Sequence, residues 1–569
     1  NLSAASLGVY RLDEAKGTDP LLAIERRIRV IRPTLRELWL YDAELTAAAL
    51  HALQTLAADS IAVRLRPTRS RRVIRQGLRA AGLPLLIVDA RAVLDEGDAL
   101  DVSEALDAVR LARVAARLQR AGFKVAGIVY RGIVRPLGQG FRALSEGELV
   151  SASPAGESEQ DAQSSYPSGG NAIELELDNT KARRWLLEAI AHSTHSVNLQ
   201  SYMALDDAVG RATCDALAAA AARGVTVRVL VDSLHGMHGS FGASNPLLVK
   251  LAAVAGVELR ASRPIVELPT LLDLKQRDHR KLLVCDGRLA LVGGRNLSHE
   301  YYVGFDEVPL TAACDWRMLP WLDAGARLEG PVVADVQRAF REAWVDAGGA
   351  SFEIASPLPL GSCAARVVVH RGLRDANTLE TYLELIASAK AHVYVVNGFP
   401  LMLELQHALL GALRRGVRVR ALCGHVTPTH GSQPFGGAWS AARMAATELV
   451  HSRLDPLVAA GAEAYLFALR DIPGWSQGLG VVHPHVHAKA ISVDGVQCAV
   501  GSANLDITAS YWESEVLVVV EDAAITRCFE TQLDARIATS TALRSDDAAW
   551  QESAKRRTWM RHWPGVLSV

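Results

Sequence analysis

The segments "HRKLLVCDGRLALVGGRN" (279–296) and "HAKAISVDGVQCAVGSAN" (487–504) carry one pattern at one spacing, HxKx4Dx6G(G/S)xN. Each begins with His-x-Lys, has an aspartate five residues after the lysine, and ends in a small-residue pair and an asparagine. A single copy of such a pattern can arise by chance. Two copies indicate a duplicated unit, in which a feature of one half has a counterpart in the other.

The hydrophobic alternation in "HRKLLVCD" and "HAKAISVD" is typical of a β-strand, so His and Lys two residues apart point to the same face. Gly294 and Ser502 follow the next strand, where a small side chain lets a ligand approach the backbone. Asn296 and Asn504 lie just beyond and can donate hydrogen bonds. Two imidazoles, two ammonium groups and two amides around one pocket suit a phosphodiester.

The flanking sequence is duplicated as well. Residues 186–232 can be laid on residues 382–424, and each stretch predicts helix, strand, turn, helix and second strand. Gly224 and Gly416 fall at matching helix ends, where a left-handed residue is expected. We therefore predict an α/β protein with two pseudo-symmetric lobes, at 172–350 and 351–569.

The paired motif resembles the HxKxxxxD signature of the phospholipase D superfamily, which occurs once per lobe. The resemblance covers roughly residues 172–545. Within that superfamily, "GGRNLSHEYYVG" (293–304), "LEGPVVADVQRAFREAW" (328–344) and "GSANLDITASYWESE" (501–515) are similar to the bacterial cardiolipin synthase-like branch. One departure concerns the last segment. That branch usually has an arginine-serine pair and an asparagine where this chain has Thr508, Ala509 and Glu513.

The resemblance implies a covalent mechanism without metal or other cofactor. One histidine attacks phosphorus and forms a phosphohistidine, while the other protonates the leaving alcohol and deprotonates the acceptor. By family precedent His279 is the nucleophile and His487 the acid/base, with Lys281 and Lys489 beside them. The symmetry of the sequence does not itself decide this order.

Each histidine needs an acceptor for its other ring nitrogen. Glu515 matches the family's acidic position and is the candidate partner of His487. The repeat points to Asp323 as its first-lobe equivalent. Asp286 and Asp494 are expected to hold the turn after each HxK strand rather than to take part in catalysis.

Alternating histidines at His483, His485 and His487 raise the alternative of a zinc site. The first motif offers only His279, and a lysine beside each histidine would oppose a dication. We therefore predict no metal, with His483 and His485 shaping the rim of the pocket or contacting substrate.

The composition sets broad limits. The chain has 569 residues, with 61 Lys+Arg against 62 Asp+Glu. Its net charge is therefore close to zero, and no overall electrostatic field attracts it to nucleic acid or membrane. Seven scattered cysteines indicate free thiols. No apolar run reaches the length of a membrane span. The expected location is the bacterial cytoplasm or membrane periphery. The start at Asn1 rather than Met leaves room for a removed targeting segment.

A Ser-, Gly- and Pro-rich stretch at 149–171 predicts a linker after an N-terminal domain at 1–148. That domain is expected to be α/β with a small parallel sheet, including strands in "ELWLYDAE" (37–44) and "LPLLIVDAR" (83–91). Asp42 and Asp89 end these strands, and strand-end capping is the favoured interpretation over a ligand site.

The expected activity is that of a phosphodiesterase or phosphatidyltransferase acting on glycerophospholipids at a membrane surface. The alternative is a nuclease of the same superfamily, which should have a basic groove. An anionic-surface contact is a further hypothesis. It rests on seven arginines in "RLRPTRSRRVIRQGLR" (64–79), with pairing to nearby acids as the alternative. These residues are Arg64, Arg66, Arg69, Arg71, Arg72, Arg75 and Arg79.

Overall fold

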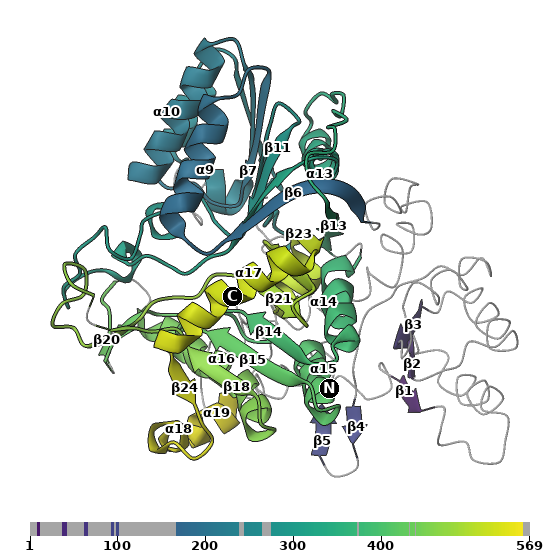
Figure 1. The fold of residues 1–569 in the computed structure, drawn as a ribbon, viewed down its shortest axis with the longest axis vertical. Coiled ribbons are helices and arrows are strands. Elements are labelled where there is room, and N and C mark those ends of the chain that lie inside the picture. Colours follow the sequence, from purple (N-terminus) through teal and green to yellow (C-terminus); the bar gives the residue numbers. More distant parts are fainter. Residues whose placement is uncertain are drawn as a thin grey trace, which may run out of the picture.

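The structure is a computed structural model. It describes residues 167–560, apart from 238–243, 265–274, 373–374, 432, 438–439 and 471, together with five short strands before residue 102. The two lobes lie one above the other, the first in blue and teal and the second in green and yellow (Figure 1).

A single 15-stranded sheet runs through both lobes. The first lobe contributes, in spatial order from the middle of the sheet, β6 (Ser168–Glu176), β12 (Gly325–Glu329), β11 (Leu289–Gly293), β10 (Leu282–Cys285), β7 (Ser196–Ser201), β8 (Thr226–Asp232) and β9 (Val257–Ser262). The second contributes β13 (Cys363–Arg371), β23 (Ser514–Glu521), β22 (Gln497–Gly501), β21 (Ala490–Val493), β14 (His392–Val396), β15 (Arg418–Cys423), β18 (Glu463–Leu466) and β24 (Thr541–Leu543). Apart from β24, the two series match strand for strand.

Helices cover the sheet in both lobes. In the first lobe α9 and α10 lie on one side of the strands and α13 on the other (Figure 1). The helices are α9 (Asn179–Ala191), α10 (Ala208–Ala222), α11 (Pro246–Ala252), α13 (Val333–Asp346), α14 (Asn377–Ser388), α15 (Leu403–Arg414), α16 (Ser440–Ala459), α17 (Ala523–Thr539), α18 (Ala548–Glu552) and α19 (Ala554–Met560). Short π-helices lie at Ser233–Met237 and Thr508–Trp512, and 3₁₀ turns at His299–Tyr301 and Trp316–Met318. A second sheet combines β17 (Gln433–Pro434), β16 (Thr429–His430), β20 (Val481–His483) and β19 (Leu469–Arg470).

Local signals in the sequence account for the helix ends. Asp178 and Asp207 accept hydrogen bonds from the first free amides of α9 and α10, as N-cap residues do. Gly224 and Gly416 follow α10 and α15 with φ of +85° and +82°, the left-handed conformation predicted for them. The duplicated sequence therefore folds into duplicated elements.

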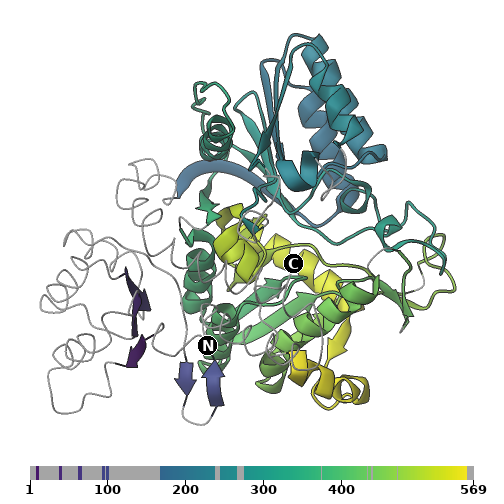
Figure 2. The same cartoon turned by 180° about the vertical axis from the view of Figure 1, so that it is seen from behind.

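The lobes join where β13 pairs with β6 in antiparallel fashion. Helix α17 of the second lobe lies between the lobes in both views (Figure 1, Figure 2). Its residue Gln532 donates to Leu175 O of β6 at 3.0 Å. Since β6 begins at Ser168, the last residues of the predicted linker belong to the first lobe. The rest of that linker lies outside the described residues.

In the N-terminal region, β1 (Gly8–Arg11), β2 (Glu37–Tyr41) and β3 (Ala62–Arg66) form a parallel sheet, as predicted. A hairpin joins β4 (Val93–Asp95) to β5 (Asp98–Asp101). Arg64 and Arg66 fall in β3, and Asp42, Asp89 and the predicted strand 83–91 lie outside the described residues. So do the remaining arginines, Arg69, Arg71, Arg72, Arg75 and Arg79.

Candidate active site

Two histidine–carboxylate pairs form the centre of the site, and each pair joins the two lobes. His279 Nδ1 lies 2.7 Å from Glu515 Oε1, and His487 Nδ1 lies 2.7 Å from Asp323 Oδ2. All four side chains are buried. The sequence-based pairing of Glu515 with His487 is therefore wrong, because the two carboxylates exchange partners across the lobes.

Backbone pairing between the lobes produces this exchange. His279 N donates to Ser514 O at 2.9 Å, directly before the glutamate of β23. On the other side, Leu322 N donates to His485 O at 2.9 Å, and His487 N donates to Leu322 O at 2.8 Å. Each histidine segment thus runs beside the chain that carries the opposite lobe's carboxylate. The sequence repeat reveals which residues correspond, but not which chain edges meet.

Both motif lysines are buried beside their histidines. Lys281 Nζ donates to the His279 carbonyl at 2.6 Å. Lys489 Nζ lies 2.8 Å from His487 Nδ1 and also donates to the His487 carbonyl. Burial lowers the pKa of Lys281 to about 7 and that of Lys489 to about 8, although nearby carboxylates oppose the shift. An anion entering the site would favour their charged forms.

The two imidazoles are held neutral. Burial, with a further contribution from the Lys281 charge, lowers the pKa of His279 to about 4. Burial and the charges of Lys489, Lys281 and His279 hold the pKa of His487 well below its usual range. The charges of Lys281 and Lys489 thus act on both histidines. A neutral imidazole that donates from Nδ1 keeps a lone pair on Nε2, as a nucleophile or base requires.

Aromatic rings support the two halves in parallel ways. Tyr202 meets His279 edge-to-face at 4.6 Å between ring centroids, and Lys281 Nζ lies 4.9 Å from the Tyr202 ring centroid. Phe399 follows the equivalent strand and meets His487 at 6.0 Å. Sequence analysis missed both rings, although Tyr202 directly follows β7 and Phe399 lies three residues after the end of β14, the corresponding strand.

The predicted phosphate-binding asparagines lie beside the pairs. Asn296 Nδ2 donates to the Tyr301 hydroxyl at 2.9 Å. The Oδ1 atoms of Asn296 and Asn504 are buried without a hydrogen-bond partner among the described residues. These side chains therefore retain polar atoms that the folded chain leaves unsatisfied.

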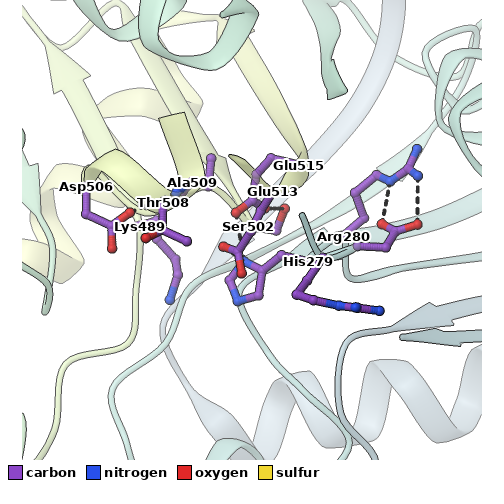
Figure 3. Close-up of polar contacts among 12 residues, drawn as sticks. His279, Arg280, Lys489, Ser502, Asp506, Thr508, Ala509, Glu513 and Glu515 are labelled. Atoms are coloured by element: carbon purple, nitrogen blue, oxygen red, sulfur yellow. Dashed lines mark hydrogen bonds and ion pairs between the residues drawn. The ribbon is translucent and has the colours of Figure 1, made fainter. Parts of the chain in front are cut away.

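Gly294 and Ser502 each lie against the carboxylate of one pair. A Cβ on Gly294 would lie 2.3 Å from Asp323 Oδ1, so glycine makes room for that carboxylate. The Ser502 hydroxyl donates to Glu515 Oε2 (Figure 3). Both residues thus contact the acid of a pair, and their assignment as phosphate-contacting groups stays a prediction.

The two motif aspartates hold the turns after β10 and β21. Asp286 accepts from the backbone amides of residues 194–196, and Asp494 from those of residues 390–392. Each adopts φ of +53°, which an aspartate tolerates in a tight turn. These contacts are those expected of structural residues.

The two additional histidines are part of the packing around the second lobe. His485 Nδ1 donates to His425 O at 2.9 Å, and its ring meets Trp321 at 4.7 Å. His483 stacks on His425 at 5.2 Å. Within the described part of the chain, neither belongs to a group of three potential metal ligands.

One such group of three potential ligands does occur among the residues that the structure describes: His279, Glu513 and Glu515 offer ligand atoms within 4.8 Å of one another. Two of the three are already joined by the 2.7 Å hydrogen bond between His279 and Glu515, and the Lys281 charge acts on both glutamates. We therefore interpret the group as a cluster that shares protons. Glu513 was noticed in the sequence only as a departure from the related branch.

Comparison with known proteins agrees with this geometry. The family described as "Cardiolipin synthase, PLD-like domain" matches residues 186–312 and 382–537, one stretch in each lobe. The chain belongs to the phospholipase D superfamily and is an enzyme of the phospholipase D type. Within that superfamily it falls in the cardiolipin synthase-like branch.

Curated relatives match about two thirds of the chain. Cardiolipin synthase A of Pseudomonas aeruginosa is 28% identical over 381 residues, covering 66% of this chain and 69% of the relative. Cardiolipin synthase B of Salmonella typhimurium is 28% identical over 417 residues, covering 70% and 87%. A solved phosphatidylserine synthase from Haemophilus influenzae has a TM-score of 0.49 at 13% identity, covering 71% of this chain and 96% of its own. Among the helices that the structure describes, none has the length and apolar character to cross a membrane.

Proposed function

We propose that this protein transfers or hydrolyses the phosphatidyl group of glycerophospholipids through a covalent phosphohistidine on His279. The observation that carries the proposal is the crossed arrangement of two neutral imidazoles, each anchored through Nδ1 to a buried carboxylate. Relatives named cardiolipin synthase support a lipid phosphodiester as the substrate class.

In the first step, the lone pair of His279 Nε2 attacks phosphorus, and the bond from phosphorus to the leaving alcohol breaks. His487, which takes up a proton from solvent as the substrate binds, gives that proton to the departing oxygen. Because the phosphodiester carries a negative charge, its arrival raises the proton affinity of His487, which the neighbouring lysines depress in the empty site. Lys281 and Lys489 offset the charge that develops on the phosphoryl oxygens.

In the second step, His487 takes a proton from water or an acceptor alcohol, whose oxygen attacks phosphorus and breaks the phosphorus–nitrogen bond. Glu515 and Asp323 keep each ring oriented and stabilise the imidazolium that forms in turn. The chain thereby returns to its starting protonation state with no cofactor consumed.

The test is incubation with vesicles of mixed bacterial phospholipids and glycerol, followed by mass spectrometry of the lipids. Transferase activity yields new phosphatidyl alcohols, and hydrolase activity yields phosphatidic acid. His279→Ala should abolish both. The matched control is His195→Ala, because that side chain is exposed and away from the site. Unchanged lipids with the wild-type protein, together with cleavage of single-stranded DNA, would overturn the proposal in favour of a nuclease.

A further inference from the structure

The two halves of the site differ at one position that the repeat makes comparable. Trp321 lies two residues before Asp323, and its ring centroid lies 5.7 Å from that of His487. Glu513 lies two residues before Glu515, and its Oε2 lies 3.8 Å from His279 Nδ1. The nucleophile side thus has a second carboxyl group where the acid/base side has an indole.

Glu513 and Glu515 differ in the hydrogen bonds that their carboxyl groups make. Both oxygens of Glu515 are engaged, Oε1 by His279 and Oε2 by the Ser502 hydroxyl. Glu513 is only 6% exposed, and its Oε2 lies beyond hydrogen-bond distance of His279 Nδ1, at 3.8 Å. In Figure 3 its carboxyl group lies beside the His279 ring. A buried carboxylate without a donor is costly, whereas a carboxylic acid at the same place carries a donor of its own.

The surrounding charges favour the acid form. Burial and the charges of Glu515 and Asp506 hold the pKa of Glu513 well above its usual range, against the opposing charges of Lys281 and Lys275. Burial alone would also raise the pKa of Glu515, but His279 and Lys281 bring it below the ordinary value. Glu513 and Glu515 offer oxygen atoms within 4.8 Å of each other. The two carboxyl groups therefore keep one proton between them, and it resides on Glu513.

We propose that Glu513 is a substrate-binding residue that donates its carboxylic O–H to a non-bridging phosphoryl oxygen beside His279. The proposal rests on the proposed function, since it concerns the phosphate of the same substrate. The donor is available only while Glu513 is protonated. Once ionised, the group would repel the phosphate and place a second negative charge next to Glu515.

The alternative occupant of this cluster is a divalent metal bound by His279, Glu513 and Glu515. Such an ion would have to displace the proton between His279 Nδ1 and Glu515 and would lie in the field of Lys281. A bound phosphate would leave that proton in place and would be attracted by the Lys281 charge. The two possibilities differ in their response to a chelator.

The experiment compares wild type, Glu513→Gln and Glu513→Leu, all with EDTA, over a range of pH. Glutamine keeps a donor of the same shape at every pH, so its activity should match wild type within a few-fold under mildly acidic conditions and persist further into the alkaline range. Leucine removes the donor and should raise KM roughly ten- to hundredfold, the usual worth of a hydrogen bond to a charged group. Glu521→Gln is the control, because Glu521 lies at the far end of β23, the strand that begins directly after Glu513.

A second measurement separates this proposal from the lipid activity. Binding of inorganic phosphate, measured by calorimetry, should weaken as pH rises. This weakening should begin at a lower pH in wild type than in Glu513→Gln, whichever lipid is the substrate. Lipid inactivity together with this phosphate result would count against the proposed function alone. Identical pH profiles for wild type and Glu513→Gln, or a wild-type KM in Glu513→Leu, would overturn the role of Glu513. Loss of wild-type activity in EDTA would do the same and favour the metal.

Discussion

Asp323 Oδ2 accepts a hydrogen bond from His487 Nδ1 across the boundary between the lobes, and Glu515 does the same for His279. Each lobe therefore supplies a histidine to one pair and a carboxylate to the other. The two pairs are equivalent in geometry, but their surroundings differ, and this difference allows the two histidines to have different roles.

Removing either carboxylate's charge should impair turnover without unfolding the protein. In Asp323→Asn and Glu515→Gln the shape is retained, but the ring tautomer is no longer fixed and the imidazolium loses its counter-charge. We expect kcat to fall about 10²- to 10⁴-fold, while KM changes little. Steady-state kinetics and circular dichroism would measure this, with Glu521→Gln as the control. A wild-type kcat in both variants would contradict a catalytic role for the pairs.

The two histidines should be separable by trapping the covalent intermediate. With a donor that has a good leaving group, such as p-nitrophenol, His487→Ala should still form the phosphoenzyme because that alcohol needs little protonation. The intermediate should accumulate, since no base remains to activate the acceptor. Acid-labile phosphate on the protein, absent in His279→Ala, is the expected result.

The opposite pattern would exchange the two assignments and keep the covalent mechanism. No phosphoenzyme in either variant, combined with inversion at phosphorus in the wild type, would indicate direct displacement instead.

Gly294→Ala should damage the site through a single methyl group. The added Cβ would lie 2.3 Å from Asp323 Oδ1, so the carboxylate must move away from His487. We expect at least a tenfold loss of kcat and a loss of stability on the order of 1–3 kcal/mol. Gly224→Ala is an informative control, because it has φ of +85° with open space around it and should cost about 1 kcal/mol without affecting kcat. Equal kcat for both variants would contradict the proposed contact.

Stability should fall in mild acid because several histidines are buried in the neutral form. Burial lowers the pKa of His451 and His483 to about 4 and that of His235 to about 3, from an ordinary 6.5. At a pH between these lowered pKa values and 6.5, the unfolded chain binds more protons than the folded one. The free energy of unfolding should thus decrease as pH falls below 6.5, by on the order of 1.4 kcal/mol per pH unit for each such histidine.

Thermal unfolding measured from neutral pH down to about pH 4.5 checks this expectation. His192 is exposed, so His192→Gln should leave the slope unchanged. A Tm that stays constant over the range would contradict this expectation.

The sequence identified the lobes and the HxK residues because their spacing is repeated in one chain, and such a repeat can be recognised without coordinates. It also identified Asp323 and Glu515 as acids. Their partners could not be deduced, because the contacts from Leu322 to His485 and from Ser514 to His279 depend on how the two chain edges meet. The role of Ser502 was missed for the same reason.

The crossed pairs also bear on how such a chain arose. A solitary lobe would carry one HxK segment and one acid, yet its acid would be out of reach of its own imidazole. Two identical lobes related by a twofold axis would complete both pairs at once. The duplicated gene is therefore best understood as the fusion of an ancestral homodimer, after which the halves were free to diverge, as Trp321 and Glu513 have done.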